Sequence, residues 1–273
     1  MDRERVYGVD FSGARDAGRR IWLAEGRIGD GRLHVEGCYP AEELPGSGRA
    51  REAALGALRR LIAGEPGAAF GLDFPFGLPL PPLVEEVGSW EAFVRAFPTD
   101  YPTADAFRQS CRARHPSGEL KRQTDAEVKT PFAAYNLRLY RQTYYGIREV
   151  LYPLARDGAA CVLPMQARCP DRAWVLEICP ASTLKREGLP AQQYKAKTEE
   201  GRRTREAILA GIEAQGQIEI GSAGLRVRII EEEGGDALDS VIAAWATYRA
   251  VGAPEIDPVA GLRAYALEGY VYV

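Results

Sequence analysis

Hydrophobic positions near the start of the chain alternate with polar ones or run together in short blocks, and both patterns are typical of strands. Residues 5–12, 19–27 and 31–39 each fit one of them. The link between the second and third blocks contains Asp30-Gly31, a dipeptide that favours a tight hairpin. We therefore predict that the chain opens with three antiparallel strands.

The next segment changes from a strand pattern to a helical one. Apolar residues recur at helical spacing over residues 49–63, with arginines on the opposite side, and a glycine- and proline-rich link follows at 64–67. Residues 68–73 are an apolar block that predicts a fourth strand. Because a strand, a helix and a strand of one sheet normally form a right-handed parallel crossover, we expect a parallel connection here.

Residues 83–135 contain short helical segments, at 90–97 and 104–114, separated by prolines, and we predict an irregular or helical insertion at about 80–135. The remaining pattern predicts further helices and strands. Helices are expected at 136–155, 181–187, 198–214 and 236–251, and strands at 159–163, 173–178, 225–230 and 269–273. We predict one α/β domain over residues 1–273, with a mixed sheet flanked by helices.

Composition excludes several classes of protein. Hydrophobic residues make up 46% of the chain and charged residues 27%, which is ordinary for a soluble globular protein. No apolar run approaches the ~20 residues that a membrane helix needs, and no signal-peptide core follows Met1. We expect a cytoplasmic protein with no membrane partner. A net charge of −3 argues neither for nor against a polyanionic partner.

Cysteine and histidine usage restricts the available chemistry. The five cysteines include no C-x-x-C pair, so we expect reduced, mostly buried thiols rather than a disulfide framework or a zinc site. The only histidines, His34 and His115, lie in neither a zinc-binding nor a nucleophile-elbow context. A carboxylate-only metal site needs no histidine, and oxygen ligands favour Mg²⁺ or Mn²⁺.

Three carboxylates come at the ends of predicted strands. Asp10 ends the apolar run that starts at Val6, Asp73 ends the fourth strand, and Glu177 stands near the end of the strand at 173–178. A carboxylate at such a position needs water, a cation or a hydrogen-bond partner to offset its desolvation. Because neighbouring parallel strands end at one crevice, we expect these side chains to converge. For Asp73, a purely local role in the turn remains an alternative.

Asp236 and Asp239 open the long apolar helix predicted at 236–251. They are three residues apart, which places both on one face of a helix, where they could chelate one cation. Carboxylates in a first turn also stabilise free N–H groups and the helix dipole, so helix capping is an equal alternative. We take Asp10, Asp73, Asp236, Asp239 and Glu177 as candidate catalytic residues.

Basic residues concentrate in two regions, 105–148 and 185–205. One interpretation is a set of solvated helix faces; the other is a rim that contacts phosphates around an acidic centre. For the second we single out four arginines as candidate nucleic-acid contacts: Arg108, Arg112, Arg138 and Arg141. Four aromatic residues are candidate stacking surfaces for bases: Phe107, Tyr135, Tyr140 and Tyr144.

A resemblance to a known family rests on five motifs. In chain order they are Gly8-Val9-Asp10-Phe11-Ser12-Gly13, Gly71-Leu72-Asp73-Phe74-Pro75-Phe76-Gly77-Leu78-Pro79, Glu177-Ile178-Cys179-Pro180-Ala181-Ser182, Asp236-Ala237-Leu238-Asp239-Ser240 and Glu268-Gly269-Tyr270. These resemble the motifs of the DUF429 family, a group of uncharacterised proteins placed among the ribonuclease H-like nucleases. The second motif is the most specific. In the last, the family usually has tryptophan where this chain has Tyr270.

The resemblance implies a ribonuclease H-like fold, in which three antiparallel strands are followed by strands parallel to the first. It also implies that Asp10, Asp73 and the Asp236/Asp239 pair match the acidic residues that hold divalent metals in that superfamily, especially in its Holliday-junction-resolvase branch. On this basis we expect a nuclease that uses Mg²⁺ or Mn²⁺ to hydrolyse phosphodiester bonds in nucleic acid.

Two other classes of function remain open. An ATP-using enzyme related to actin and sugar kinases would share the strand order and a similar first glycine turn, but it should carry a second glycine-rich phosphate turn. Residues 71–75 are a poor version of such a turn. A non-catalytic nucleic-acid-binding module is the third option. DNA and RNA are not distinguished, and a homodimer is left open.

Overall fold

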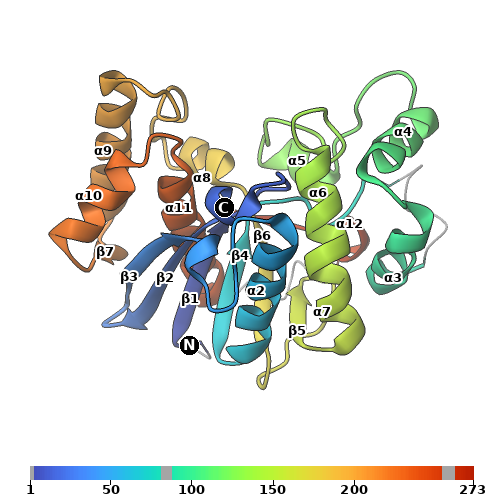
Figure 1. The fold of residues 1–273 in the computed structure, drawn as a ribbon, viewed down its shortest axis with the longest axis horizontal. Helices are drawn as coiled ribbons and strands as arrows, with labels where there is room; N and C mark the ends of the chain where they lie inside the picture. Colours follow the sequence, from blue (N-terminus) through green and yellow to red (C-terminus); the bar gives the residue numbers. More distant parts are fainter. Residues whose placement is uncertain (1–2, 81–87, 254–261) are drawn as a thin grey trace.

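The protein is built around one mixed β-sheet. The structure, a computed structural model, describes residues 3–80, 88–253 and 262–273, and in these ranges eight strands form a single sheet (Figure 1). The strand order is β5-β6-β4-β1-β2-β3-β7, and β8 pairs with β6. The strands are β1 (Arg5–Asp10), β2 (Trp22–Gly29), β3 (Arg32–Pro40), β4 (Ala68–Leu72), β5 (Ala160–Leu163), β6 (Ala173–Ile178), β7 (Ile218–Ile220) and β8 (Val271–Tyr272).

Strand directions agree with the sequence pattern. Strands β1, β2 and β3 are antiparallel neighbours, as the three opening blocks predicted. Strand β4 pairs with β1 in parallel, and β6 pairs with β4 in parallel, so the crossover prediction is also confirmed. The protein is therefore a mixed α/β fold whose central sheet has helices around it.

Helices cover both faces of the sheet. The longer ones are α2 (Arg51–Gly64), α3 (Trp90–Asp100), α4 (Ala104–Arg114), α9 (Glu199–Ala214), α10 (Ala223–Glu231) and α11 (Asp236–Gly252). The shorter ones are α1 (Ala17–Arg20), α5 (Gln123–Glu127), α6 (Tyr140–Gly146), α7 (Tyr152–Asp157), α8 (Pro180–Arg186) and α12 (Arg263–Glu268). A 3₁₀ turn, η1 (Ala41–Glu43), follows β3, and a π-helical turn, η2 (Ile147–Leu151), joins α6 to α7.

Alternate residues of β1 belong to different cores. Tyr7 and Val9 pack with α2 and with the α6–α7 helix, whereas Val6 packs with α9, α10 and α11. This alternation is the period of two that a strand buried on both faces requires. Figure 1 shows α2 and α11 on opposite sides of the strands.

Helix α11 lies against β1 more closely than an ordinary side chain would permit. A Cβ atom on Gly8 would come within 2.1 Å of the backbone N of Ala244 and the backbone O of Ser240. Only glycine fits at this crossing, and the close approach fixes where along β1 the helix begins.

The predicted insertion at about 80–135 contains α3, α4 and α5, while its residues 81–87 lie outside the described residues. Phe97, Tyr101, Phe107 and Tyr144 pack ring against ring and join α3 and α4 to α6. Our expectation that Phe107, Tyr135, Tyr140 and Tyr144 stack on bases is wrong, because all four side chains are buried. All four belong to the core of the protein.

Several local expectations need correction. Residues 225–230, predicted as a strand, lie in α10, whose N-cap Ser222 accepts a hydrogen bond from the N–H of Leu225 at 3.1 Å. Cys161 and Cys169 form a disulfide, although the sequence predicted reduced thiols. The sequence pattern did not predict five short elements: α1, η1, α5, β7 and α12. Across the described ranges, no helix has the length and apolar character needed to cross a bilayer.

Candidate active site

Two aspartates lie at the ends of neighbouring parallel strands. Asp10 is the last residue of β1, and Asp73 follows β4 directly. The N–H of Asp73 donates to the carbonyl oxygen of Val9 at 3.0 Å, which continues the pairing of the two strands to their tips. Gln142 of α6 donates through Nε2 to the backbone carbonyl of Asp73 and ties this helix to the strand end. Both carboxylates thus lie at the carboxyl edge of the sheet.

Helix α11 brings Asp236 and Asp239 to the same edge. The helix begins at Asp236, and its fifth residue, Ser240, already lies over Gly8 of β1. The first turn of α11 is therefore beside the end of β1, where Asp10 stands.

Glu232, rather than Asp236 or Asp239, caps the start of α11. Helix capping was the alternative role that we considered for these two aspartates. Oε2 of Glu232 accepts hydrogen bonds from the N–H groups of Asp236 at 2.7 Å and Ala237 at 3.3 Å. The N-cap residue itself is Gly235, which makes no side-chain cap. The carboxylates of Asp236 and Asp239 are thus available for other contacts.

A lysine that the sequence analysis did not single out lies against these carboxylates. Lys195 Nζ is 2.5 Å from Oδ2 of Asp239, and the hydroxyl of Tyr194 donates to Oδ1 of Asp239 at 2.9 Å. The Asp239 side chain is only 2% exposed, whereas that of Lys195 is 50% exposed. Lys195 thus provides a positive charge that offsets the burial of Asp239.

Arg205 of α9 holds the loop that carries Lys195. Its buried guanidinium donates through Nε to the carbonyl of Ile230 at 2.7 Å and through Nη1 to the carbonyl of Tyr194 at 2.6 Å. The same Nη1 lies 3.3 Å from the carbonyl of Ala196. These bonds fix the backbone on both sides of Lys195, so its position is set by the fold rather than by the loop alone.

Asp10 is close enough to Asp73, Asp236 and Asp239 for their negative charges to change its pKa. Burial raises the pKa of Asp10 well above its usual range, and the charges of Asp236, Asp239 and Asp73 add to this, while Lys195 opposes it. Burial and the charge of Asp239 raise the pKa of Asp73 to about 7. Burial also raises the pKa of Asp236 to about 6. Burial and the neighbouring negative charges therefore disfavour the charged forms of these carboxylates, and a nearby cation would lower this cost.

Burial works against the charged ammonium of Lys195, but the carboxylates of Asp239 and Asp10 outweigh it and raise its pKa. Lys195 therefore stays charged at neutral pH.

In the described part of the chain, no three His, Cys, Asp or Glu side chains form a group ready to hold a metal ion. The donor chemistry nevertheless suits a hard cation, because the four aspartates offer only oxygen atoms and repel one another.

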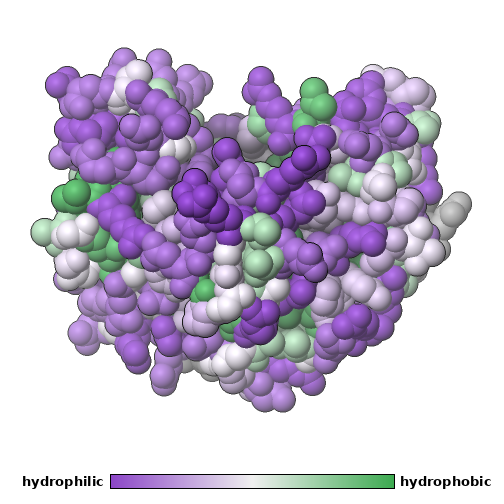
Figure 2. Space-filling model, in the orientation of Figure 1, coloured by the Kyte–Doolittle hydropathy of each residue, from purple (hydrophilic) through white to green (hydrophobic). Residues whose placement is uncertain are grey.

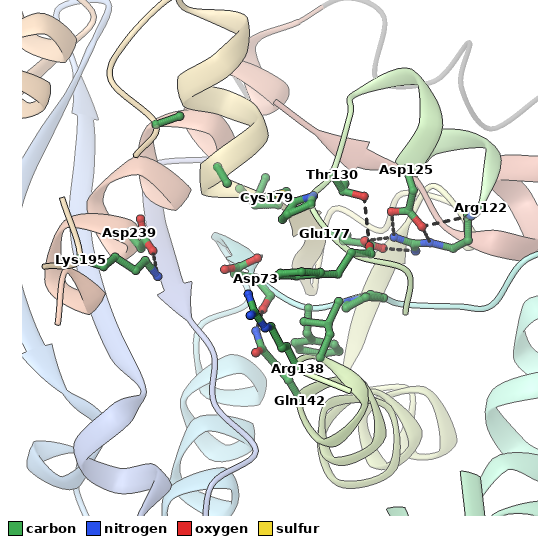
Figure 3. Close-up of a pocket in the computed structure, with 18 of the residues that line it drawn as sticks. Asp73, Arg122, Asp125, Thr130, Arg138, Gln142, Glu177, Cys179, Lys195 and Asp239 are labelled. Atoms are coloured by element: carbon green, nitrogen blue, oxygen red, sulfur yellow. Dashed lines mark hydrogen bonds and ion pairs between the residues drawn. The ribbon is translucent and has the colours of Figure 1, made fainter. Parts of the chain in front are cut away.

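A pocket of about 390 Å³ opens beside this cluster. Asp73, Asp239 and Lys195 line one part of it, and Arg138 and Gln142 extend toward Asp73 from the region of α6 (Figure 3). Figure 2 shows the upper edge of the molecule hollowed, with mainly hydrophilic residues on either side. The pocket therefore gives solvent and small molecules access to Asp73 and Asp239, whereas Asp10 and Asp236 are not among its lining residues.

Comparison with known protein families shows which family the chain belongs to. The family described as "Protein of unknown function (DUF429)" matches residues 8–257. The chain belongs to the DUF429 family. The match runs from β1 past the end of α11 and includes Asp10, Asp73, Asp236 and Asp239, while the Glu268-Gly269-Tyr270 motif lies beyond it. Comparisons with curated proteins and with solved structures gave no match.

Glu177, the fifth candidate in this DUF429 protein, is engaged in a buried ion pair. Both carboxylate oxygens face Arg122, with Nη1 donating to Oε2 at 2.8 Å, and the N–H of Phe76 donates to the same Oε2 at 2.9 Å. Arg122 also donates to Asp125 through Nε at 2.9 Å and Nη2 at 2.8 Å. Burial disfavours the charged guanidinium of Arg122, but Asp125 and Glu177 outweigh this effect and raise the pKa of Arg122. Burial also raises the pKa of Glu177, and the charge of Arg122 opposes that shift.

The same cluster reaches the motif at 268–270. Arg122 Nη1 donates to the carbonyl of Glu268 at 3.0 Å, and the Glu268 side chain accepts from the N–H groups of Leu80 at 2.5 Å and Gln123 at 2.7 Å. These bonds join β6, α5 and the 74–80 segment into one rigid wall of the pocket (Figure 3). Glu177 thus has a clear role in positioning this wall, and its carboxylate is not free for the acidic centre.

The four candidate arginines of this DUF429 protein differ in whether they line the pocket. Arg138 is exposed and lines the pocket. The guanidinium groups of Arg108 in α4 and Arg141 in α6 lie 5.6 Å and 5.1 Å from the centre of the Tyr140 ring. Arg112 is exposed on α4. Only Arg138 lies where it can contact a ligand in the pocket.

Cys179 also lines the pocket, but its thiol is not a nucleophile. Burial, together with the charge of Asp73, raises the pKa of this thiol to about 12. A thiol with such a pKa is protonated at neutral pH and unreactive. The chemistry of the pocket therefore depends on its carboxylates and its basic residues.

Proposed function

We propose that this DUF429 protein hydrolyses phosphodiester bonds of nucleic acid with Mg²⁺ or Mn²⁺ at the Asp10, Asp73, Asp236 and Asp239 cluster. The observation that carries the proposal is that the ends of β1 and β4 and the first turn of α11 place these four aspartates at one edge of the sheet, where the charges of the other three act on Asp10. Asp73 and Asp239 also line an accessible pocket. A ribonuclease H-like topology fits the antiparallel order of β1, β2 and β3 with β4 beside β1. We include a ribonuclease H-like fold in the proposal on this basis.

Asp10, Asp73 and either Asp236 or Asp239 are the residues that would hold the divalent metal ions. A bound divalent pair would supply activation of the attacking water and stabilisation of the leaving oxygen. The raised pKa values of Asp10, Asp73 and Asp236 support this assignment, because a cation relieves the repulsion that produces part of them.

The other residues of the site position the aspartates and the pocket wall. Gln142 fixes the strand tip that carries Asp73. Lys195 neutralises Asp239 when no other cation is near, and Tyr194 keeps the Asp239 carboxylate in a set orientation. The wall formed by Arg122 and Glu177 keeps the pocket open and rigid. Arg138 is the side chain best placed to contact a phosphate from the pocket side.

A cleavage assay separates this function from the ATP-using alternative. Purified protein with Mn²⁺ should cut at least one member of a panel of single-stranded, duplex and branched DNA and RNA, and chelation should stop it. An ATP-using enzyme would instead be stabilised by ATP with Mg²⁺, release phosphate and cut no polymer. That second pattern would replace the proposed function.

A further inference from the structure

The size of the pocket limits what can enter it. Its volume of about 390 Å³ lies within the range of roughly 300–1,000 Å³ that is typical of sites for small molecules. One nucleotide is a ligand of this class, but a double helix is far too wide. A base that remains paired in a duplex cannot enter without leaving the stack.

One wall of the pocket offers an aromatic face. Phe132 lines the pocket and is half-buried, in contrast to the four buried aromatic residues that the sequence suggested. The guanidinium of Arg138, another lining residue, lies 5.5 Å from the centre of the Phe132 ring. A partly exposed ring beside an arginine is a common stacking platform for unpaired bases.

The acidic and basic side chains that line the pocket are distributed differently on its two sides. Asp73, Asp239 and Lys195 belong to the acidic centre, while Arg122, Asp125 and Glu177 neutralise one another in the opposite wall (Figure 3). Over the whole pocket, four acidic and three basic side chains contribute to the lining. A phosphate therefore meets excess negative charge at the acidic centre, and its binding there should depend on a divalent cation.

From these features we infer that the pocket receives one unpaired nucleotide, with its base against Phe132 and its phosphate directed toward Asp73 and Asp239. The inference rests on the proposed function and names its substrate class: nucleic acid that presents a single-stranded end or an unpaired nucleotide. Arg138 joins the two parts of this site, because it lies beside the Phe132 ring and extends toward Asp73.

Binding measurements test the site without relying on turnover. The Asp10→Asn protein with Mn²⁺ is titrated by fluorescence anisotropy against a single strand, a blunt duplex and the same duplex with an unpaired extension, each as DNA and RNA. The single strand and the extended duplex should bind at least about tenfold more tightly than the blunt duplex.

Variants then locate the contact. Phe132→Leu keeps an apolar side chain but removes the ring face, so it should weaken single-strand binding about tenfold, and Phe132→Tyr should restore it. Val227→Ala, at an exposed apolar residue of α10 outside the pocket, is the matched control and should change nothing. Equal binding of the blunt duplex, or unchanged binding by a folded Phe132→Leu protein, would overturn the inference.

Cleavage by the wild type distinguishes the two proposals. If unpaired nucleotides bind as described but no polymer is cut with Mn²⁺, the nuclease function fails and the nucleotide site stands. If a blunt duplex is cut as fast as a single strand, and Phe132→Leu cuts it equally well, the nuclease function stands and the nucleotide site fails.

Discussion

Gly8 of β1 and Gly71 of β4 are paired side by side across the two central parallel strands, and both lie under helix α11. A Cβ atom at Gly71 would come within 1.9 Å of Oγ1 of Thr247, as one at Gly8 would meet the backbone of α11. This shared glycine position lets the helix rest directly on the strands. The aspartates at its first turn are thereby set beside Asp10.

The first prediction concerns this crossing. Gly8→Ala should push α11 away from β1 and lower the free energy of unfolding by about 1–3 kcal/mol, as overpacking does in other cores. Gly224→Ala is the control, because a Cβ atom there meets nothing within 4 Å and alanine favours the helix α10. Denaturant unfolding of the two variants measures the difference. Equal stabilities would show that the close approach is not required.

Strand ends were the part of the site that the sequence predicted well. Asp10 and Asp73 each follow a short apolar run, and this local signal was enough to place both at the carboxyl edge of the sheet. The start of α11 at Asp236 was likewise readable from Gly234-Gly235 and the apolar run that follows. Such features depend on neighbouring residues and so survive without a structure.

Long-range partners were not predictable. Arg122 and Glu177 are 55 residues apart in the sequence, and no local pattern links them. Lys195 lies in a loop without hydrophobic periodicity, so nothing marked it as the partner of Asp239. The apolar run in α10 resembled a strand because its β-branched residues hid the helical spacing and the Ser222 cap. The Cys161–Cys169 disulfide likewise depends on a loop that returns to β5.

The second prediction concerns pH. The pKa values of Asp73 and Asp236, about 7 and about 6, lie above their unfolded values, so the folded protein binds more protons than the unfolded chain between about pH 4 and 7. The contribution of these groups to stability therefore falls as pH rises through this window. Asp73→Asn should flatten the fall in Tm between pH 5 and 8, measured by calorimetry, whereas Asp157→Asn at an exposed site should not.

Metal ions should reverse this trend. Millimolar Mg²⁺ or Mn²⁺ should raise Tm, and more so at pH 8 than at pH 5.5, because protons compete with the cation for the same carboxylates. Unchanged Tm values with both ions at pH 8 would contradict a metal site at this cluster.

A third prediction addresses Lys195. Lys195→Met removes the charge that offsets buried Asp239, so Tm without metal should fall by roughly 2–4 °C at pH 8, and the increase in Tm caused by Mg²⁺ should become larger. Lys197→Met is the control, because its ammonium makes an exposed pair with Glu233. Thermal unfolding with and without Mg²⁺ checks both effects. A smaller metal response in Lys195→Met would indicate that Lys195 helps to bind the ion rather than replacing it.

The fourth prediction separates structural from catalytic carboxylates. Arg122→Met leaves Glu177 and Asp125 buried without their partner and should lower the free energy of unfolding by about 3–5 kcal/mol. The double variant Arg122→Met/Glu177→Met should recover part of this loss and keep cleavage activity. Arg203→Met, at an exposed pair with Glu199, should have little effect. Abolished cleavage in a folded double variant would restore Glu177 as a catalytic candidate.

The central claim is that Asp10 carries the chemical step, and one comparison tests it most directly. Initial rates of Mn²⁺-dependent cleavage are measured for wild type, Asp10→Asn and the control Asp157→Asn, using the best substrate of the nucleic-acid panel. Asp10→Asn should lose at least about 100-fold in rate while its affinity for the substrate stays largely intact, and Asp157→Asn should cut like wild type. A folded Asp10→Asn protein that cuts as fast as wild type would contradict the account.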